Sequence, residues 1–125
     1  MNQQHIDALN ELCTAAHEHS REKGFWDAVD AESDVGPRNA AAVHTLMLIG
    51  KVGLIMSECG EMVEAVRKPA LDPHCPQFSN EAIEAADVFI RLADYCKARE
   101  IDLGEAVAAK MAYNATRPSM HGKEA

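Results

Sequence analysis

The sequence lacks the cysteine patterns that would indicate a metal site or a set of disulfides. Among Cys13, Cys59, Cys75 and Cys96 there is no C-x-x-C pair, and no histidine stands at zinc-finger spacing, so neither a zinc site nor a disulfide framework is predicted. We expect reduced core thiols, as in a cytoplasmic protein. The opening residues, MNQQHIDALNEL, have no basic segment followed by an apolar one, so no secretory signal is predicted.

Positive charge is also scarce. Twelve lysines and arginines stand against twenty aspartates and glutamates, which gives a formal net charge of -8 and a pI near 5.1. A chain with this charge repels phosphate backbones and anionic lipid surfaces, so we expect neither nucleic acid nor a membrane as its partner. An anionic substrate would need cations to mediate its binding.

Long uninterrupted hydrophobic runs are absent. The longest apolar stretch, AAAVHTLMLIGKVGLIM, is broken by His44 and Lys51 and is too short to span a bilayer comfortably, so it predicts a buried helix. With 125 residues, 47% of them hydrophobic, and only five prolines, the chain is suited to one domain over residues 1–125.

Helical periodicity is present in the first half of the chain. Apolar residues recur at helical spacing over residues 4–23, and Gly24 ends that pattern. The segment of about residues 24–38 has no apolar period and predicts a long loop. A second, very apolar helix is predicted from an Asn39 cap to Arg67, ahead of Pro69.

The second half predicts two more helices. A loop of about residues 68–78 contains three prolines and leads to a cap at Ser79 or Asn80, after which a third helix begins. The fourth helix begins at Asp102, with Glu105 three residues on as in a capping box, and runs to about Thr116. No strand pattern or internal repeat is present, so we predict an all-α fold of four helices, with a tail of about residues 117–125.

Two pairs of acids follow helical spacing. Glu58 and Glu61, in the segment SECGEMVEA, and Glu84 and Asp87 each stand three residues apart, which places each pair on one helix face. If the second and third helices pack antiparallel, the four carboxylates meet. Such a cluster persists only with cations or shifted pKa values, and oxygen ligands favour magnesium or manganese.

A solvated helix face is the other interpretation of these acids. Glu84, Asp87, Arg91 and Asp94 form a polar stripe in which Asp87 and Arg91 can make an i,i+4 pair. Glu58 fits this alternative less well, because it continues a largely apolar stripe, where a charge needs a partner.

The tail offers a second polar group. Lys110, Asn114 and Arg117 fall at i, i+4 and i+7, so two cations and an amide share one face that can hold a phosphate or a base edge. A solvated basic helix end is the equally weighted alternative.

Taken in order, EKGFWD, SECGEMVEA, NEAIEAADVFIRLADY and KMAYNATRPSMHGK resemble the MazG-like nucleoside triphosphate pyrophosphohydrolases, over about residues 5–123. Those all-α enzymes carry E-x-x-E on one helix and E-x-x-D on the next. The resemblance implies a four-helix bundle completed by dimerisation, as a homodimer or a dimer of dimers. The family pattern often begins E-E-x-x-E, and here Ser57 takes the place of the first glutamate, so any role of that glutamate is in doubt.

The resemblance also implies a reaction. A nucleoside or deoxynucleoside triphosphate is hydrolysed between its α and β phosphates to the monophosphate and pyrophosphate. Glu58, Glu61, Glu84 and Asp87 are then the magnesium ligands, with manganese as a substitute, and Glu58 or Glu61 takes the proton of the attacking water.

Substrate-binding residues follow from that reaction. Phosphate charge would be stabilised by cationic side chains and the base bound by aromatic and amide groups. For Trp26 an equally weighted alternative is an anchor that ties its loop to the core. The candidates are Lys51, Arg91, Lys110 and Arg117 for the phosphates, and Trp26 or Phe25 with Asn114 for the base.

Two other classes of protein compete with the pyrophosphohydrolase interpretation. A non-catalytic helical dimer, acting as a nucleotide-binding or regulatory module, would leave the acids solvated, and Ser57 supports it. A di-iron carboxylate bundle requires E-x-x-H pairs, and neither Glu58 nor Glu84 is followed by histidine three residues on.

Overall fold

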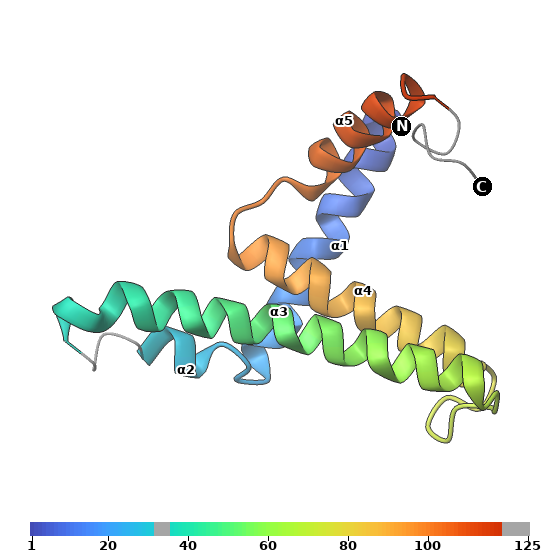
Figure 1. The fold of residues 1–125 in the computed structure, drawn as a ribbon, viewed down its shortest axis with the longest axis horizontal. Helices are drawn as coiled ribbons and strands as arrows, with labels where there is room; N and C mark the ends of the chain where they lie inside the picture. The colour runs from blue at the N-terminus through green and yellow to red at the C-terminus, as the bar shows by residue number, and fades with distance from the viewer. Residues whose placement is uncertain (32–35, 119–125) are drawn as a thin grey trace.

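The computed structural model describes residues 1–31 and 36–118, which form five helices (Figure 1). α3 and α4 lie side by side and antiparallel, α1 crosses α4, and α5 folds back along α1. The all-α prediction is confirmed for this part of the chain, while residues 119–125 of the predicted tail lie outside it. The helices are α1 (Gln3–Glu22), α2 (Asp27–Asp30), α3 (Pro37–Arg67), α4 (Asn80–Ala98) and α5 (Leu103–Ala115).

Side-chain caps begin three of the helices. The Asn2 side chain accepts a hydrogen bond from the His5 amide, Ser79 accepts one from Ala82, and Asp102 accepts one from Glu105. The caps predicted at Ser79 and Asp102 are confirmed. The pKa of Asp102 is lowered, first by the hydrogen bond from the Glu105 amide and then by one from the Asn10 side chain.

The first connection differs from the predicted unbroken loop of residues 24–38. It contains the one-turn helix α2, and α3 begins at Pro37 rather than at Asn39. Gly36 precedes that proline with φ +84°, a backbone conformation that side chains with a Cβ rarely adopt. α2 forms because Trp26 and Val29 pack on Leu48 of α3, a contact between distant residues that local periodicity does not reveal.

The prediction that the apolar second helix is buried is wrong for a single chain. Leu48 and Ala65 are its only buried residues, and 6% of its most apolar window is buried. The reason is that α3 packs on α4 and α2 along one side only. By length and composition alone, α3 is the one helix of the described chain that could cross a membrane, a weak criterion that core helices also meet.

Two stripes of residues at heptad spacing run along α3. The inner stripe is buried or half-buried and consists of Leu48, Lys51, Ile55, Glu58, Met62 and Ala65. The outer stripe is exposed throughout and consists of Ile49, Val52, Met56, Cys59, Val63 and Val66. Alternating spacings of three and four residues are typical of helices that pack against each other. The inner stripe of α3 packs within the chain, whereas the outer stripe has no packing partner in the described residues.

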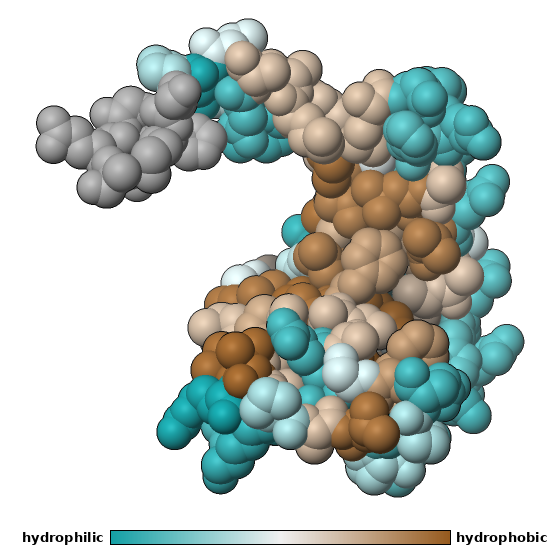
Figure 2. Space-filling model, turned by 90° about the vertical axis from the view of Figure 1, so that its right-hand side faces the viewer, coloured by the Kyte–Doolittle hydropathy of each residue, from teal (hydrophilic) through white to brown (hydrophobic). Residues whose placement is uncertain are grey.

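Apolar side chains also gather in a hollow between the α1–α5 arm and the α3–α4 pair (Figure 2). α1 and α5 approach closely at Gly104, where a Cβ atom would stand 2.6 Å from the backbone oxygen of Ile6. The arm is therefore fixed by backbone packing, while much of the apolar surface beside it stays exposed, as at Phe89 and Ile90 of α4.

Candidate metal centre

Three carboxylates meet where α3 packs on α4. Glu58 comes from the inner stripe of α3, and Glu84 and Asp87 stand one turn apart on α4. One oxygen from each lies within 4.8 Å of the others, and all three residues are half-buried. We call these three residues the carboxylate cluster.

Glu61 is the fourth acid of the predicted set and lies just outside the cluster. It is exposed on α3, one turn after Glu58. Its charge still contributes to raising the pKa of Glu84. The structure therefore brings three of the four predicted acids into one group and leaves the fourth beside it.

Burial and mutual repulsion raise two pKa values in the cluster. The pKa of Glu84 is raised first by burial and then by the charges of Asp87, Glu58 and Glu61. The pKa of Asp87 is raised by burial and by Glu58, against a lowering effect of Arg91. Both shifts mean that the ionised cluster is destabilised in the folded chain, so a bound cation would stabilise it.

Asp72 adds negative charge that the sequence analysis did not identify. It is 8% exposed, and its Oδ1 accepts hydrogen bonds of 2.9 and 2.7 Å from the amides of His74 and Cys75. Its charge raises the pKa of both Glu84 and Asp87. The Asp-Pro pair in LDPHC signals a turn, but nothing local indicates that this turn lies beside the cluster.

Arg91 already has a partner in the cluster. Its Nε donates a 2.6 Å hydrogen bond to Oε1 of Glu58, and its side chain is 38% exposed against 16% for Glu58. The guanidinium thus balances the one glutamate that lies on the largely apolar inner stripe.

Trp26 lies where a residue that anchors its loop to the core would lie, which is the alternative to a base-stacking role. It is 3% exposed, and its Nε1 donates to both carboxylate oxygens of Asp94 at 2.8 and 3.1 Å. Lys51 lies 4.6 Å from the centroid of its ring and donates to the backbone oxygen of Phe25. Trp26 and Lys51 therefore hold the first connection on the helices, and Phe25, which is 57% exposed, is the accessible aromatic side chain there.

Asp94 is the centre of a network that the sequence analysis did not predict. Besides Trp26, it bonds Nδ1 of His17 at 2.7 Å, and Arg21 donates to Nε2 of the same ring at 2.9 Å. Because Arg21 can only donate, Nε2 must accept and Nδ1 carries the hydrogen. The network ties α1, the first connection and α4 together immediately beside the cluster.

Of the three predicted tail residues, Lys110 and Asn114 lie on α5, which packs on α1 (Figure 1), and Arg117 follows its C-terminal end. Lys110 and Arg117 lie 4.7 and 5.8 Å from the ring centroid of Tyr113, and Oδ1 of Asn114 is buried with no hydrogen-bond partner among the described residues. Within one chain the structure does not bring this group to the carboxylate cluster.

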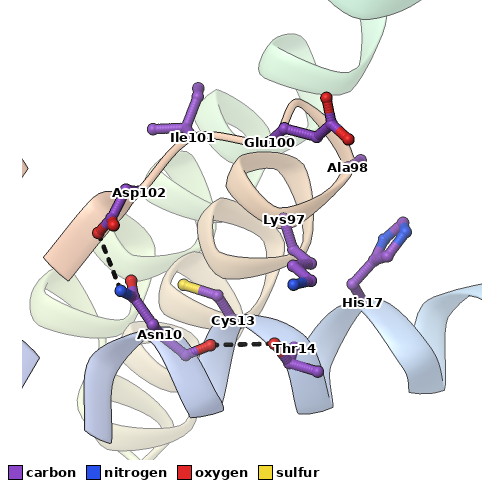
Figure 3. Close-up of a pocket in the computed structure, with 9 residues that line it drawn as sticks. All are labelled: Asn10, Cys13, Thr14, His17, Lys97, Ala98, Glu100, Ile101 and Asp102. Atoms are coloured by element: carbon purple, nitrogen blue, oxygen red, sulfur yellow. Dashed lines mark hydrogen bonds between the residues drawn. The ribbon is translucent and has the colours of Figure 1, made fainter. Parts of the chain in front are cut away.

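Two of the cavities that α1 lines are also lined by residues of α4. One of about 520 Å³ lies between α1 and the end of α4 (Figure 3), where Asn10 donates to Asp102 and Thr14 donates to the backbone oxygen of Asn10. The other, of about 330 Å³, is lined by Glu58 and Asp87 of the cluster. We call the second one the cluster cavity.

No protein-family model, curated protein or solved structure matches the chain. Functional evidence therefore comes from the geometry of the cluster and from the order and spacing of its acids in the sequence.

The raised pKa values predict how stability depends on pH. Because Glu84 and Asp87 bind protons more readily in the folded than in the unfolded chain, lowering the pH through their raised pKa values favours folding. The melting temperature of the metal-free protein should rise as the pH is lowered from neutral toward the raised pKa values of Glu84 and Asp87, measured by circular dichroism in a chelating buffer. Glu84→Gln should weaken this rise, and an identical pH dependence in the variant would contradict the assignment.

Proposed function

We propose that this protein is a magnesium-dependent hydrolase that cleaves a nucleoside or deoxynucleoside triphosphate to the monophosphate and pyrophosphate. The observation that carries the proposal is the convergence of Glu58, Glu84 and Asp87, with oxygens within 4.8 Å of one another, from two antiparallel helices. The resemblance of the acid motifs to the MazG-like enzymes supports the choice of this reaction over others that use metal-bound carboxylates.

The residues of the cluster suit a hard divalent cation. All its donor atoms are carboxylate oxygens, and no histidine or cysteine of the described chain joins the group, which favours magnesium or manganese over zinc or copper. Ligand oxygens of an octahedral magnesium shell lie about 3 to 4 Å apart, so the three carboxylates, whose oxygens are within 4.8 Å of one another, would have to move slightly closer to bind an ion. When bound, the ion would supply charge neutralisation for the phosphates and a more acidic water.

Within this proposal the two glutamates of α3 have different roles. Glu58 is half-buried and fixed by Arg91, which suits a ligand. Glu61 is exposed and makes no ion pair within the described residues, which suits a base that takes the proton of the attacking water. Arg91 has further donors for a phosphate oxygen beside its bond to Glu58.

The exposed outer stripe of α3 is suited to packing against a second copy of the chain. It repeats the spacing of the inner stripe, which already packs on α2 and α4. We therefore propose that the outer stripe pairs with another chain in a homodimer or a dimer of dimers. Phosphate or base binding by Lys110, Asn114 and Arg117 then requires that another copy place its α5 beside the cluster.

The outer stripe is tested by a charge substitution. Met56→Glu should convert the protein to a monomer, because a carboxylate in an apolar helix interface must lose its hydration. Leu71→Glu is the matched control, since Leu71 is 67% exposed and Met56 is 69% exposed, but Leu71 lies in the connection before α4. Sedimentation equilibrium measures the outcome, and equal association of Met56→Glu and the unaltered protein would contradict an interface at this stripe.

Product analysis tests the reaction. A panel of ribo- and deoxyribonucleoside triphosphates, canonical and damaged, is incubated with magnesium or manganese, and the products are separated by chromatography. We expect equal amounts of a monophosphate and pyrophosphate from at least one substrate. Release of orthophosphate with a diphosphate would move the cleavage site and exclude the proposed reaction, as would the absence of turnover with either metal.

A non-catalytic nucleotide-binding or regulatory dimer is the second candidate, and the Glu58–Arg91 pair favours it. That pair balances Glu58 without a cation, and the exposed Ser57 next to it lacks a carboxylate. Magnesium separates the two candidates, because an ion that binds the folded chain raises its melting temperature with concentration. Cations leave the melting temperature unchanged if the acids are only solvated.

A further inference from the structure

Ser20, near the end of α1, carries a hydroxyl that the chain itself does not satisfy. Its residue surface is 6% exposed, and its Oγ has no hydrogen-bond partner within residues 1–31 and 36–118. Buried hydroxyls are nearly always hydrogen-bonded, because an unpaired one loses its water without compensation. A group from outside the chain is therefore expected to complete it.

The position of Ser20 indicates where that group would lie. Ser20 lines the cluster cavity of about 330 Å³ and also a pocket of about 40 Å³ beside Trp26. Phe25, Arg91 and Asp94 line both spaces as well. Ser20 thus lies where two adjoining spaces meet, at the side of the cluster cavity formed by α1.

The lining of the cluster cavity is mixed in chemistry. Glu58, Asp87 and Arg91 are charged and mark where phosphates held through a cation would lie. Phe25 and Ile90, which are 57% and 47% exposed, add apolar surface to the same lining. A volume of about 330 Å³ is at the lower end of small-molecule sites, which typically combine apolar walls with a few polar groups. An aromatic ring with a polar edge matches that combination.

We propose that Ser20 determines the base specificity of this protein, its hydroxyl forming a hydrogen bond to the polar edge of a nucleobase in the cluster cavity. This inference rests on the proposed function for its choice of a nucleotide. A serine hydroxyl can both donate and accept a hydrogen bond, so its chemistry alone does not select one base. The titration below identifies the preferred base.

Ser20→Ala is an informative variant, because it removes a hydroxyl that has no partner in the unliganded chain. The variant should fold with unchanged or higher stability. Trp26 is the chain's single tryptophan and lines the pocket that adjoins the cluster cavity, so its fluorescence reports ligands there.

The experiment titrates the unaltered protein and Ser20→Ala with the four common deoxynucleosides and their monophosphates, with magnesium, while following Trp26 fluorescence. We expect the unaltered protein to prefer one base. In Ser20→Ala the dissociation constant for that base should rise about tenfold, and those for the other bases should change less than about twofold. Thr14→Val is the control, because the Thr14 hydroxyl lies on the same helix, donates to the Asn10 backbone oxygen and lines other cavities.

The outcomes separate this inference from the proposed function. Unchanged base preference in Ser20→Ala overturns the inference, because the hydroxyl then binds only water, while pyrophosphate release by the unaltered protein still supports the function. Ser20-dependent base binding without turnover supports the inference and overturns the function. If no deoxynucleoside or monophosphate binds, the inference is overturned. Should Ser20→Ala fail to fold, Ser20→Cys fills the side-chain space with only a weak hydrogen-bond donor, and its base preference decides in the same way.

Discussion

Glu84→Gln is expected to lower magnesium-dependent hydrolysis by at least about 100-fold, because a neutral amide removes one of three charged ligands of the proposed ion. The same change should raise the melting temperature of the metal-free protein. Burial and the charges of Asp87, Glu58 and Glu61 raise the pKa of Glu84, so the ionised side chain is a source of repulsion that glutamine lacks. Opposite effects on activity and stability distinguish a ligand from a structural residue.

Glu81→Gln is the matched control for that experiment. Glu81 lies one turn earlier on α4, is exposed and lies outside the carboxylate cluster. Its substitution should leave turnover and the magnesium-dependent rise in melting temperature close to those of the unaltered protein. Equal losses of activity in the two variants, or a lower metal-free melting temperature in Glu84→Gln, would contradict the assignment of Glu84.

Asp94→Ala should have the largest effect on stability, about 3 kcal/mol of the free energy of unfolding, because each buried donor left unpaired costs roughly 1–3 kcal/mol. The substitution leaves two such donors, Nε1 of Trp26 and Nδ1 of His17. The side chains of His17 and Asp94 are only 13% and 15% exposed, so water cannot easily replace the lost acceptor. Urea denaturation followed by circular dichroism measures the loss.

Asp30→Ala is the comparison for Asp94→Ala. Asp30 pairs with Arg21 at 2.7 Å, but the two side chains are 53% and 48% exposed, and exposed ion pairs contribute up to about 1 kcal/mol. If both variants lose the same free energy of unfolding, the buried network around Asp94 does not stabilise the fold more than an exposed ion pair does.

Much of the helical structure could be predicted from the sequence, because its signals are local. Ser79 and Asp102 cap helices with their own side chains, and the proline after Arg67 prevents that helix from continuing. The i,i+3 spacing of Glu84 and Asp87 likewise determines that they share a face of α4. Each of these features depends on a few consecutive residues.

The features that could not be predicted depend on contacts between distant residues. Asp72 lies in the connection between α3 and α4, and its charge raises the pKa of Asp87. Arg91 pairs with Glu58, 33 positions away, rather than with Asp87 on its own helix. Burial of α3 was predicted from its hydrophobicity, yet hydrophobicity does not specify whether the covering surface belongs to the same chain. The exposed outer stripe is the physical reason for that error.

Anomalous diffraction from crystals soaked in manganese tests whether Glu58, Glu84 and Asp87 together hold a divalent cation. Manganese scatters anomalously and takes the same oxygen ligands as magnesium. We expect an anomalous peak at coordination distance from carboxylate oxygens of all three residues, absent from crystals of Glu84→Gln. Crystals soaked in manganese that show no peak at the cluster, with the Glu58–Arg91 bond intact, would contradict this role of the three carboxylates.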